Sequence, residues 1–136
     1  MPFEVRYASN FYRIEVDLTA NLLQATWLRA SDKAEIVSGG TALYQVLRDT
    51  GIEYAVANAQ TLTTLSSEAK EWMSTSFYQL LSTTKLAKLA RILPENVFSK
   101  IALESVVTRA DALGVTKFQV KNFTDYQKAL AWLNEK

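Results

Sequence analysis

The stretch IEYAVANAQTLTTLSSEAKEWMSTSFYQLL, residues 52–81, predicts the fold class of the protein. Residues 52–58 form a short apolar run, which is typical of a strand buried on both faces of a sheet. From residue 66 to residue 81, apolar side chains recur with the period of an amphipathic helix. The predicted inward stripe of this helix consists of Ala69, Trp72, Met73, Ser76, Phe77 and Leu80. A buried strand followed by such a helix is the repeating unit of an α/β protein.

The segment before this unit predicts an antiparallel hairpin. In residues 12–18, apolar and charged side chains alternate with the period of a half-buried strand. Residues 22–28 follow a short polar turn and predict the partner strand. Residues 3–7 predict a further short strand at the edge of the sheet.

A helix is expected between the hairpin and the buried strand. Asp32 and Glu35 have the spacing of a capping box, and Gly51 stands where a helix would end. The apolar face of this helix would contain Ile36, Leu43 and Val46 or Leu47. Gly39 and Gly40 lie inside it, which indicates a bend or close packing, since glycine is unfavourable in a helix interior.

The C-terminal part continues the alternation of strands and helices. Residues 86–94 predict a strand, residues 95–113 a helix ended by a glycine, and residues 115–120 the last strand. Thr124 and Gln127 have the spacing of a capping box for a final helix. The inward residues of these two helices would be Leu103, Val106, Val107, Ala110 and Leu113, then Tyr126, Ala129, Leu130 and Leu133.

The predicted order ββαβαβαβα indicates one α/β domain over residues 1–136. Helical crossovers between strands imply a mixed, mostly parallel sheet with an N-terminal antiparallel hairpin and about four helices. The last four main strands should be parallel. The side chains expected inside are Val56, Leu89 or Ala90, and Phe118 or Val120.

The composition argues against several kinds of chemistry. The chain has no histidine and no cysteine, which removes the usual general base, the commonest metal ligand and all thiolate chemistry. We therefore expect no catalytic site, no metal and no cofactor. The formal net charge of +1 gives no general attraction to nucleic acid, and no apolar run reaches the roughly 18–20 residues of a transmembrane helix. These features predict a soluble, cytoplasmic protein.

Four segments taken in sequence resemble a known family. They are NLLQATWL (21–28), SSEAKEWM (66–73), ILPENVFSKIALESVV (92–107) and FTDYQKALAWL (123–133). Together with the order of elements, they resemble the SpoIIAA-like branch of the STAS superfamily, the anti-sigma-factor antagonist fold, over about residues 11–133. The resemblance implies a small stand-alone bacterial protein of STAS fold. It further implies a non-enzymatic module that acts in signalling through protein contacts.

The resemblance also suggests a role for the serine pair Ser66 and Ser67. In better-understood STAS proteins, a partner kinase phosphorylates a serine at the start of the second helix, and Ser67 falls nearest that position. This chain departs from the family pattern, because Asn58 and Ser66 stand where acids are expected. The alternative is that Ser66, or else Thr64 or Ser67, only caps the helix, as a serine before an apolar-periodic helix commonly does.

A second candidate site lies at the predicted ends of the strands. Asn58, Glu95, Asn96 and Asn122 would stand there, and ligands of open α/β sheets bind beyond the carboxyl ends of the strands. These residues could hold a small ligand or face a partner. The alternative is that they only form turns and helix caps.

The sequence leaves more than one function open. The leading hypothesis is a protein-interaction or regulatory module, with a homodimer as one such complex. The alternative is a carrier of a small apolar or lipid ligand, because related folds include CRAL-TRIO-type lipid-transfer proteins. The densest basic set could meet an acidic partner, although it lacks the aromatic platform of a nucleic-acid site. Its members are Lys85, Lys88, Arg91 and Lys100.

Overall fold

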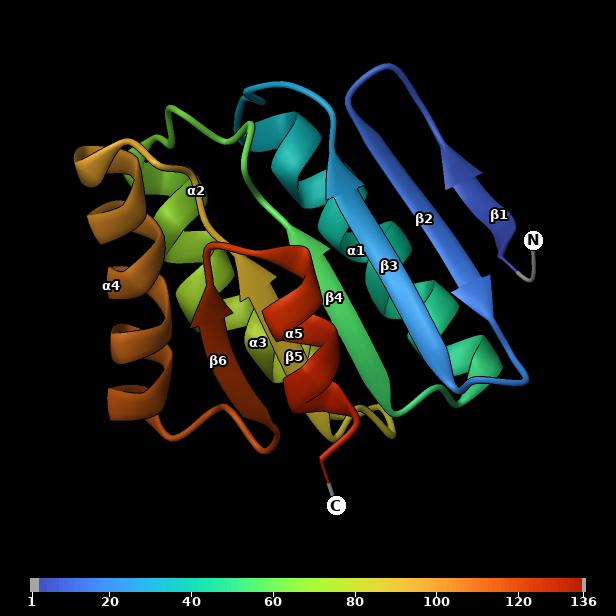
Figure 1. Cartoon of the computed structure of the whole chain (residues 1–136). Coiled ribbons are helices and arrows are strands. Elements are labelled where there is room, and N and C mark those ends of the chain that lie inside the picture. The colour runs from blue at the N-terminus through green and yellow to red at the C-terminus, as the bar shows by residue number, and fades with distance from the viewer. Residues whose placement is uncertain (1–2, 136) are drawn as a thin grey trace.

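The computed structural model describes residues 3–135 and contains a six-stranded mixed sheet covered by helices (Figure 1). The strands are β1 (Glu4–Ala8), β2 (Tyr12–Asp17), β3 (Leu22–Trp27), β4 (Tyr54–Asn58), β5 (Lys88–Ile92) and β6 (Gln119–Phe123). They lie side by side in the order of the chain. β1, β2 and β3 pair antiparallel, and β3 to β6 pair parallel. The predicted α/β class, N-terminal hairpin and four parallel strands are therefore confirmed.

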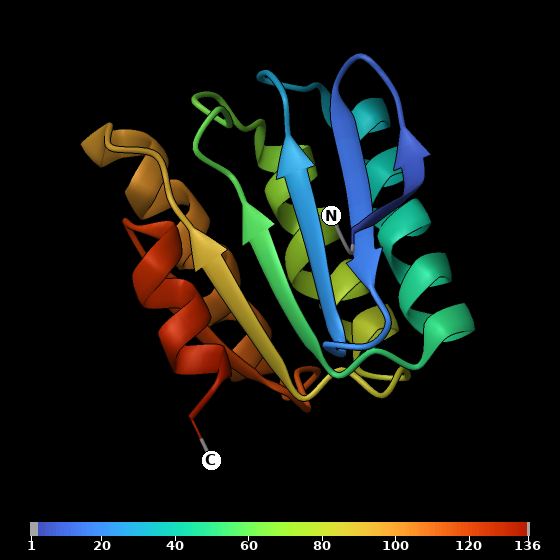
Figure 2. The same ribbon diagram turned by 45° about the vertical axis from the view of Figure 1, so that its right-hand side comes forward.

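Four helical segments connect and cover the strands in the described part of the chain. They are α1 (Lys33–Thr50), the continuous run of α2 (Ser67–Trp72), η1 (Met73–Phe77) and α3 (Tyr78–Leu81), then α4 (Val97–Leu113) and α5 (Tyr126–Leu133). Because the strand order never reverses, right-handed crossovers place α1, α2–α3 and α4 on one face of the sheet. The last helix, α5, lies on the opposite face and packs on β4, β5 and β6 (Figure 2).

The hairpin forms because local chemistry and burial agree. Ile14 and Val16 alternate with polar residues along β2, and both are buried against the helices. In the turn, the Asp17 carboxylate accepts a hydrogen bond from the Ala20 backbone N–H at 3.1 Å. Asn21 adopts a positive φ of 56°, which asparagine tolerates better than most residues.

Helix α1 has the ends that its sequence predicts. The Asp32 carboxylate accepts from the Glu35 N–H at 2.9 Å, and the Glu35 carboxylate accepts from the Asp32 N–H at 3.2 Å. Gly51 ends the helix with a φ of 70°, a conformation that favours glycine. The predicted capping box and stop are confirmed.

The glycine pair inside α1 permits close packing. A Cβ atom on Gly39 would lie 2.8 Å from ring atoms of both Trp27 and Tyr12. A Cβ atom on Gly40 would lie 2.7 Å from the ring of Trp72. Both glycines therefore allow aromatic rings to rest directly on the helix backbone.

The sheet separates two hydrophobic clusters. The larger cluster lies between the sheet and α1–α4, and it includes Leu89 and Phe118. The smaller one lies under α5 and consists of Val56, Ala90, Ile92, Ala129, Trp132 and Leu133. Of the strand residues expected inside, only Val120 is half-buried rather than buried.

The second helix departs from its predicted inward stripe. Residues Met73–Phe77 form a π-helical turn, which inserts an extra residue relative to the α-helical period. The stripe therefore rotates, so that Ser74, Tyr78 and Leu81 are buried while Ser76 and Leu80 are only half-buried.

Three predictions about the C-terminal part were wrong in detail. The last strand begins at Gln119 rather than at residue 115, because the Lys117 N–H bonds to the Ser82 hydroxyl at 2.9 Å instead of joining the sheet. Asp125, not Thr124, caps α5, with its carboxylate accepting from two backbone N–H groups at 2.6 and 3.2 Å. Leu113, predicted to face inward, is 49% exposed. Among residues 3–135, no helix is long and apolar enough to cross a membrane.

Candidate functional site

The carboxyl ends of the parallel strands and the starts of the helices meet at one edge of the molecule. The arrowheads of β3 to β6 point toward the same edge in Figure 1, and α1, α2 and α4 begin there. The residues that cap the four helical segments at this edge are Asp32, Ser66, Asn96 and Asp125. This is the edge at which open α/β sheets commonly bind ligands.

Hydrogen bonds between loops hold this edge together. The Thr61 hydroxyl donates to the Trp27 carbonyl at 2.6 Å, which joins the loop after β4 to the end of β3. The Ser99 hydroxyl donates to the Thr63 carbonyl at 2.7 Å, which joins the first turn of α4 to the loop before α2. The starts of α2 and α4 are therefore fixed relative to each other.

The two serines at the start of α2 differ in their surroundings. Ser66 is the N-cap, and its hydroxyl accepts a hydrogen bond from the Ala69 N–H at 3.1 Å. The predicted capping role of Ser66 is confirmed. Ser67 is the first residue of α2 and is exposed, and it lines a surface groove between α2 and α4.

The polar residues at the strand ends do not form one site. The Asn58 side chain accepts from the Gln60 N–H at 3.0 Å, and Asn96 accepts from the Ser99 N–H at 3.1 Å, so both shape local backbone. Glu95 is exposed. Asn58 pairs in register with Ile92, which in turn pairs with Phe123, whereas Asn122 pairs with Arg91.

Asn122 therefore lies on the opposite face of the sheet from Asn58, since register partners share a face. Its side-chain oxygen is buried and has no hydrogen-bond partner among residues 3–135. It borders a surface hollow together with Lys100, Glu104 and Lys128. Of the four strand-end residues, Asn122 alone has an unused buried polar atom.

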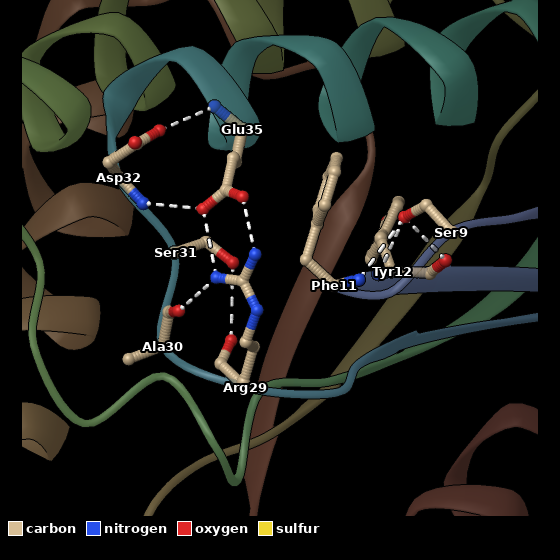
Figure 3. A network of polar contacts seen from close by, with 8 residues as sticks. All are labelled: Ser9, Phe11, Tyr12, Arg29, Ala30, Ser31, Asp32 and Glu35. Carbon is tan, nitrogen blue, oxygen red and sulfur yellow. Dashed lines mark hydrogen bonds and ion pairs between the residues drawn. The ribbon is translucent and has the colours of Figure 1, made fainter.

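An ion pair connects the loop after β3 to the start of α1 (Figure 3). The Arg29 guanidinium donates to both carboxylate oxygens of Glu35 at 3.0 and 2.5 Å and to the Ala30 carbonyl at 2.9 Å. It also lies over the Phe11 ring, 5.8 Å from the ring centre. The hydrogen bond from Arg29, together with the Asp32 N–H, lowers the pKa of Glu35.

An exposed apolar cluster lies on the first turns of α4. Val97, Phe98 and Ile101 are 62%, 83% and 56% exposed, and their spacing places them on neighbouring positions of the helix surface. We call these three residues the α4 cluster. The sequence analysis did not predict the α4 cluster. The sequence does contain a signal for it, since these three apolar residues lie before the inward stripe, which begins at Leu103.

The α4 cluster adjoins the groove between α2 and α4. This groove has a volume of about 730 Å³, with Ser67 and Lys70 on one wall and Ile101 and Glu104 on the other. Arg109 and Glu71 bridge it with an ion pair at 2.8 Å. The cluster, the groove and Ser67 thus form one continuous surface.

A small cavity lies inside the larger cluster, beneath the carboxyl ends of the strands. Its volume is about 30 Å³, and its walls are mostly apolar, with Tyr12, Trp27 and Trp72 among them. Ala57 and Ala59 of the β4 end also line it, and their small side chains leave space between the rings. Burial raises the pKa of the Tyr12 phenol.

Arg91 is the charged residue in the wall of this cavity. It is 4% exposed, and it donates to the Tyr78 hydroxyl at 2.7 Å and to the Leu103 carbonyl at 2.5 Å. The predicted basic surface set is therefore wrong for Arg91, which points into the core. The alternation of the strand contained the signal, since Arg91 is in phase with the buried Leu89 and Leu93.

No group of three or more histidine, cysteine or acidic residues is placed to hold a metal ion within residues 3–135. Comparisons with protein-family models, curated proteins and solved structures give no match to the chain. What the geometry defines is the class: an α/β protein with a six-stranded mixed sheet, an N-terminal antiparallel hairpin and four helical segments.

Proposed function

We propose that the protein is a non-enzymatic, STAS-like regulatory module that acts by binding a partner protein through the α4 cluster and the adjoining groove. The observation that carries this proposal is the 83% exposure of Phe98 between Val97 and Ile101. Large contiguous patches of exposed apolar side chains are uncommon on soluble monomers, and they commonly mark interaction sites. Aromatic residues are also enriched at the centres of protein interfaces.

The surroundings of the cluster fit a protein surface better than a flat lipid or nucleic-acid surface. Lys70, Glu71, Glu104 and Arg109 place both signs of charge beside it. Such mixed charge suits the polar rim of a protein interface, whereas nucleic acid or anionic lipid would require clustered positive charge. The hydrogen bond from Ser99 to Thr63 keeps the two walls in a fixed relation, so little ordering is needed on binding.

The first test replaces Phe98. We expect Phe98→Ser to leave stability nearly unchanged, because the side chain is exposed, and to weaken the complex at least tenfold. Leu113→Ser is the matched control, since Leu113 is an exposed apolar residue at the other end of the same helix. Proteins captured from the source cells by the wild type and by Leu113→Ser, but not by Phe98→Ser, would be purified and titrated against all three forms.

The result also separates the kinds of partner. A mass measurement in solution that finds a wild-type dimer and a Phe98→Ser monomer would identify a second copy of this chain as the partner. Equal capture by all three forms, with a monomer throughout, would overturn the proposal.

Ser67 is the place where regulation of this surface would act, since it lines the groove. A phosphate at this position would lie at the start of α2, where backbone N–H groups and the helix dipole favour negative charge. We expect capping by Ser66 to be the main role of the pair, so Ser67→Asp and Ser67→Ala should bind the partner as the wild type does. A change in affinity with Ser67→Asp alone would show that negative charge at this position controls binding, as a phosphorylation switch requires.

The carrier of a small apolar or lipid ligand is the second candidate, and the apolar cavity favours it. The cavity of about 30 Å³ is, however, much smaller than the roughly 300–1,000 Å³ typical of ligand pockets. A lipid chain would therefore require the helices to separate from the sheet. Native mass spectrometry of the purified protein checks this alternative, because a carrier should retain a bound molecule of several hundred daltons, a mass in the range of common lipids.

A further inference from the structure

The buried guanidinium of Arg91 has no counter-ion in the part of the chain that the structure describes. None of the ion pairs formed by residues 3–135 includes it. A guanidinium has five N–H donors and keeps its charge in proteins. Within residues 3–135 the guanidinium of Arg91 forms two hydrogen bonds, to the neutral oxygens of Tyr78 and Leu103. Its positive charge is therefore uncompensated in the core, and three of its donors have no hydrogen-bond partner among the described residues.

An uncompensated charge in an apolar core is costly, because the group loses its hydration and gains no opposite charge. Buried charges are accordingly paired in most proteins. Here the place that a counter-ion would occupy is open, since Arg91 lines the internal cavity. The volume of about 30 Å³ is enough for about two water molecules, each of which needs at least 10–15 Å³.

A second residue with a polar group lines the same cavity. Tyr12 lines the cavity, and its hydroxyl forms no hydrogen bond with another residue in the part of the chain that the structure describes. A neutral phenol offers one O–H donor, and burial keeps this phenol neutral by raising its pKa. The residues that line the cavity thus supply one positive charge, unused N–H donors and one unused O–H donor.

We propose that this cavity binds a small monovalent anion, a halide or a one-carbon carboxylate, with Arg91 as its counter-ion and Tyr12 as an additional donor. One uncompensated positive charge matches one negative charge. The volume admits an ion of one to three non-hydrogen atoms and excludes larger organic anions. The apolar walls favour ions that lose hydration easily over strongly hydrated divalent anions such as sulfate. This site is independent of the protein-binding surface, because Phe98 does not line the cavity.

Trp72 marks the route between the cavity and solvent. Its side chain lines the cavity and also a surface groove near Lys33 and Glu68. It is half-buried and stacks on Phe77, with the ring centres 5.3 Å apart. Displacement of this ring would connect the cavity with the outside, so the anion can exchange without unfolding of the sheet.

The test measures thermal stability of the full chain in sodium gluconate, bromide or formate at equal ionic strength. Gluconate is too large for the cavity and serves as the reference. We expect bromide, formate or both to raise the melting temperature by several degrees, with a dependence on concentration that saturates, because binding to the folded state stabilises it by mass action. A general salt effect would instead rise without saturation. A response to formate alone would assign a carboxylate, and a response to bromide would assign a halide site.

Two variants distinguish anion binding in the cavity from anion binding at the protein surface. Arg91→Met should fold, because an apolar side chain of similar length suits the core, and it should lose the saturable response. Arg109→Met removes an exposed guanidinium and should retain the saturable response. An equal response in Arg91→Met and the wild type, or no saturable response in the wild type, would overturn the proposal.

Diffraction gives an answer that does not depend on any variant. Crystals of the wild type grown in bromide should show an anomalous scattering peak inside the cavity, in contact with the Arg91 guanidinium and displaced when bromide is replaced by gluconate. Well-ordered density for water alone at that position in both salts would show that the guanidinium is satisfied by solvent, which would refute the anion site.

Discussion

The bond between Arg29 and Glu35 shows how single residues fix the carboxyl edge of the sheet. One carboxylate completes the capping box of α1 and also accepts two hydrogen bonds from the guanidinium. The loop after β3 and the first turn of α1 are therefore held by the same side chain (Figure 3).

This arrangement predicts a dependence of stability on pH. The pKa of Glu35 is lowered from its ordinary value of 4.5, chiefly by the hydrogen bond from Arg29, so the folded state binds this proton less readily than the unfolded chain. The contribution of Glu35 is therefore present above about pH 4.5 and is lost as the pH falls through the lowered pKa. Glu35→Gln keeps the capping geometry without the charge. We expect its melting temperature to lie below that of the wild type at neutral pH, with the difference disappearing at strongly acidic pH.

The double variant supplies the control for this prediction. In an Arg29→Met background, Glu35→Gln should have a smaller effect at neutral pH than in the wild type, because only the Asp32 N–H remains to favour the charged carboxylate. A difference between wild type and Glu35→Gln that persists unchanged into acid would contradict the assignment.

Residue-scale features were predictable where they depend on near neighbours in the chain. The Asp32–Glu35 capping box, the Ser66 cap and the Gly51 stop all involve residues within a few positions of one another. The cap of α5 was misassigned, because Thr124 and Asp125 are adjacent and both can cap a helix. Backbone geometry, which composition does not reveal, selects Asp125.

At the scale of elements, the contact of α1 with the aromatic rings determines how closely helices approach the sheet. The Trp27 ring that rests on Gly39 stacks on Tyr12, with ring centres 3.9 Å apart, and both rings are buried. The Trp72 ring that rests on Gly40 is only half-buried.

The two glycines should therefore respond differently to alanine. Alanine improves helix propensity by about 1 kcal/mol, but overpacking a rigid core costs about 1–3 kcal/mol. We expect Gly39→Ala to lower the free energy of unfolding, since the added methyl group would press on the buried rings of Trp27 and Tyr12. Gly40→Ala should have a smaller effect, accompanied by greater quenching of Trp72 fluorescence as the ring moves into solvent.

Urea titration measures both free energies. Ser38→Ala is the control for helix propensity alone, because Ser38 is exposed in the same turn of α1, and it should stabilise slightly. Stabilisation by Gly39→Ala equal to that by Ser38→Ala would show that the core accommodates the methyl group.

Element positions were predictable where the periodicity is regular, as in β2, β3 and α1. The inward stripe of the second helix was not predictable from a constant α-helical period, because the π-helical turn at Met73–Phe77 changes that period. The late start of β6 depends on a hydrogen bond to Ser82, more than thirty residues earlier, which no local pattern contains.

At the scale of the whole molecule, both hydrophobic clusters share one sheet. Trp27 belongs to the larger cluster and Trp132 to the smaller one, and the two clusters alternate along the same strands β4 and β5. The strands that support one cluster therefore also support the other.

We therefore expect one cooperative unfolding transition. In a variant that retains Trp27 alone and in one that retains Trp132 alone, tryptophan fluorescence and far-ultraviolet circular dichroism should give the same urea midpoint. A fluorescence transition of the Trp132 variant at clearly lower urea than its circular dichroism would show that α5 unfolds separately.

The candidate sites were the least predictable part of the molecule. The cavity unites Tyr12, Arg91 and the end of β4, which only the three-dimensional sheet brings together. The separation of Asn58 from Asn122 likewise depends on strand register, which the sequence pattern of either strand alone does not set.

The order of the strands in the sheet has a consequence for synthesis of the protein. Each strand from β2 to β6 adds to the outer edge of those already made, and no later strand inserts between two earlier ones. As the chain leaves the ribosome from its N-terminus, the hairpin can form first, and each completed helix–strand unit can then join it in turn. The sheet can thus grow at the pace of translation, because at each stage the next strand pairs with the edge strand made before it. Growth ends when β6 is added and α5 covers the strands at that end.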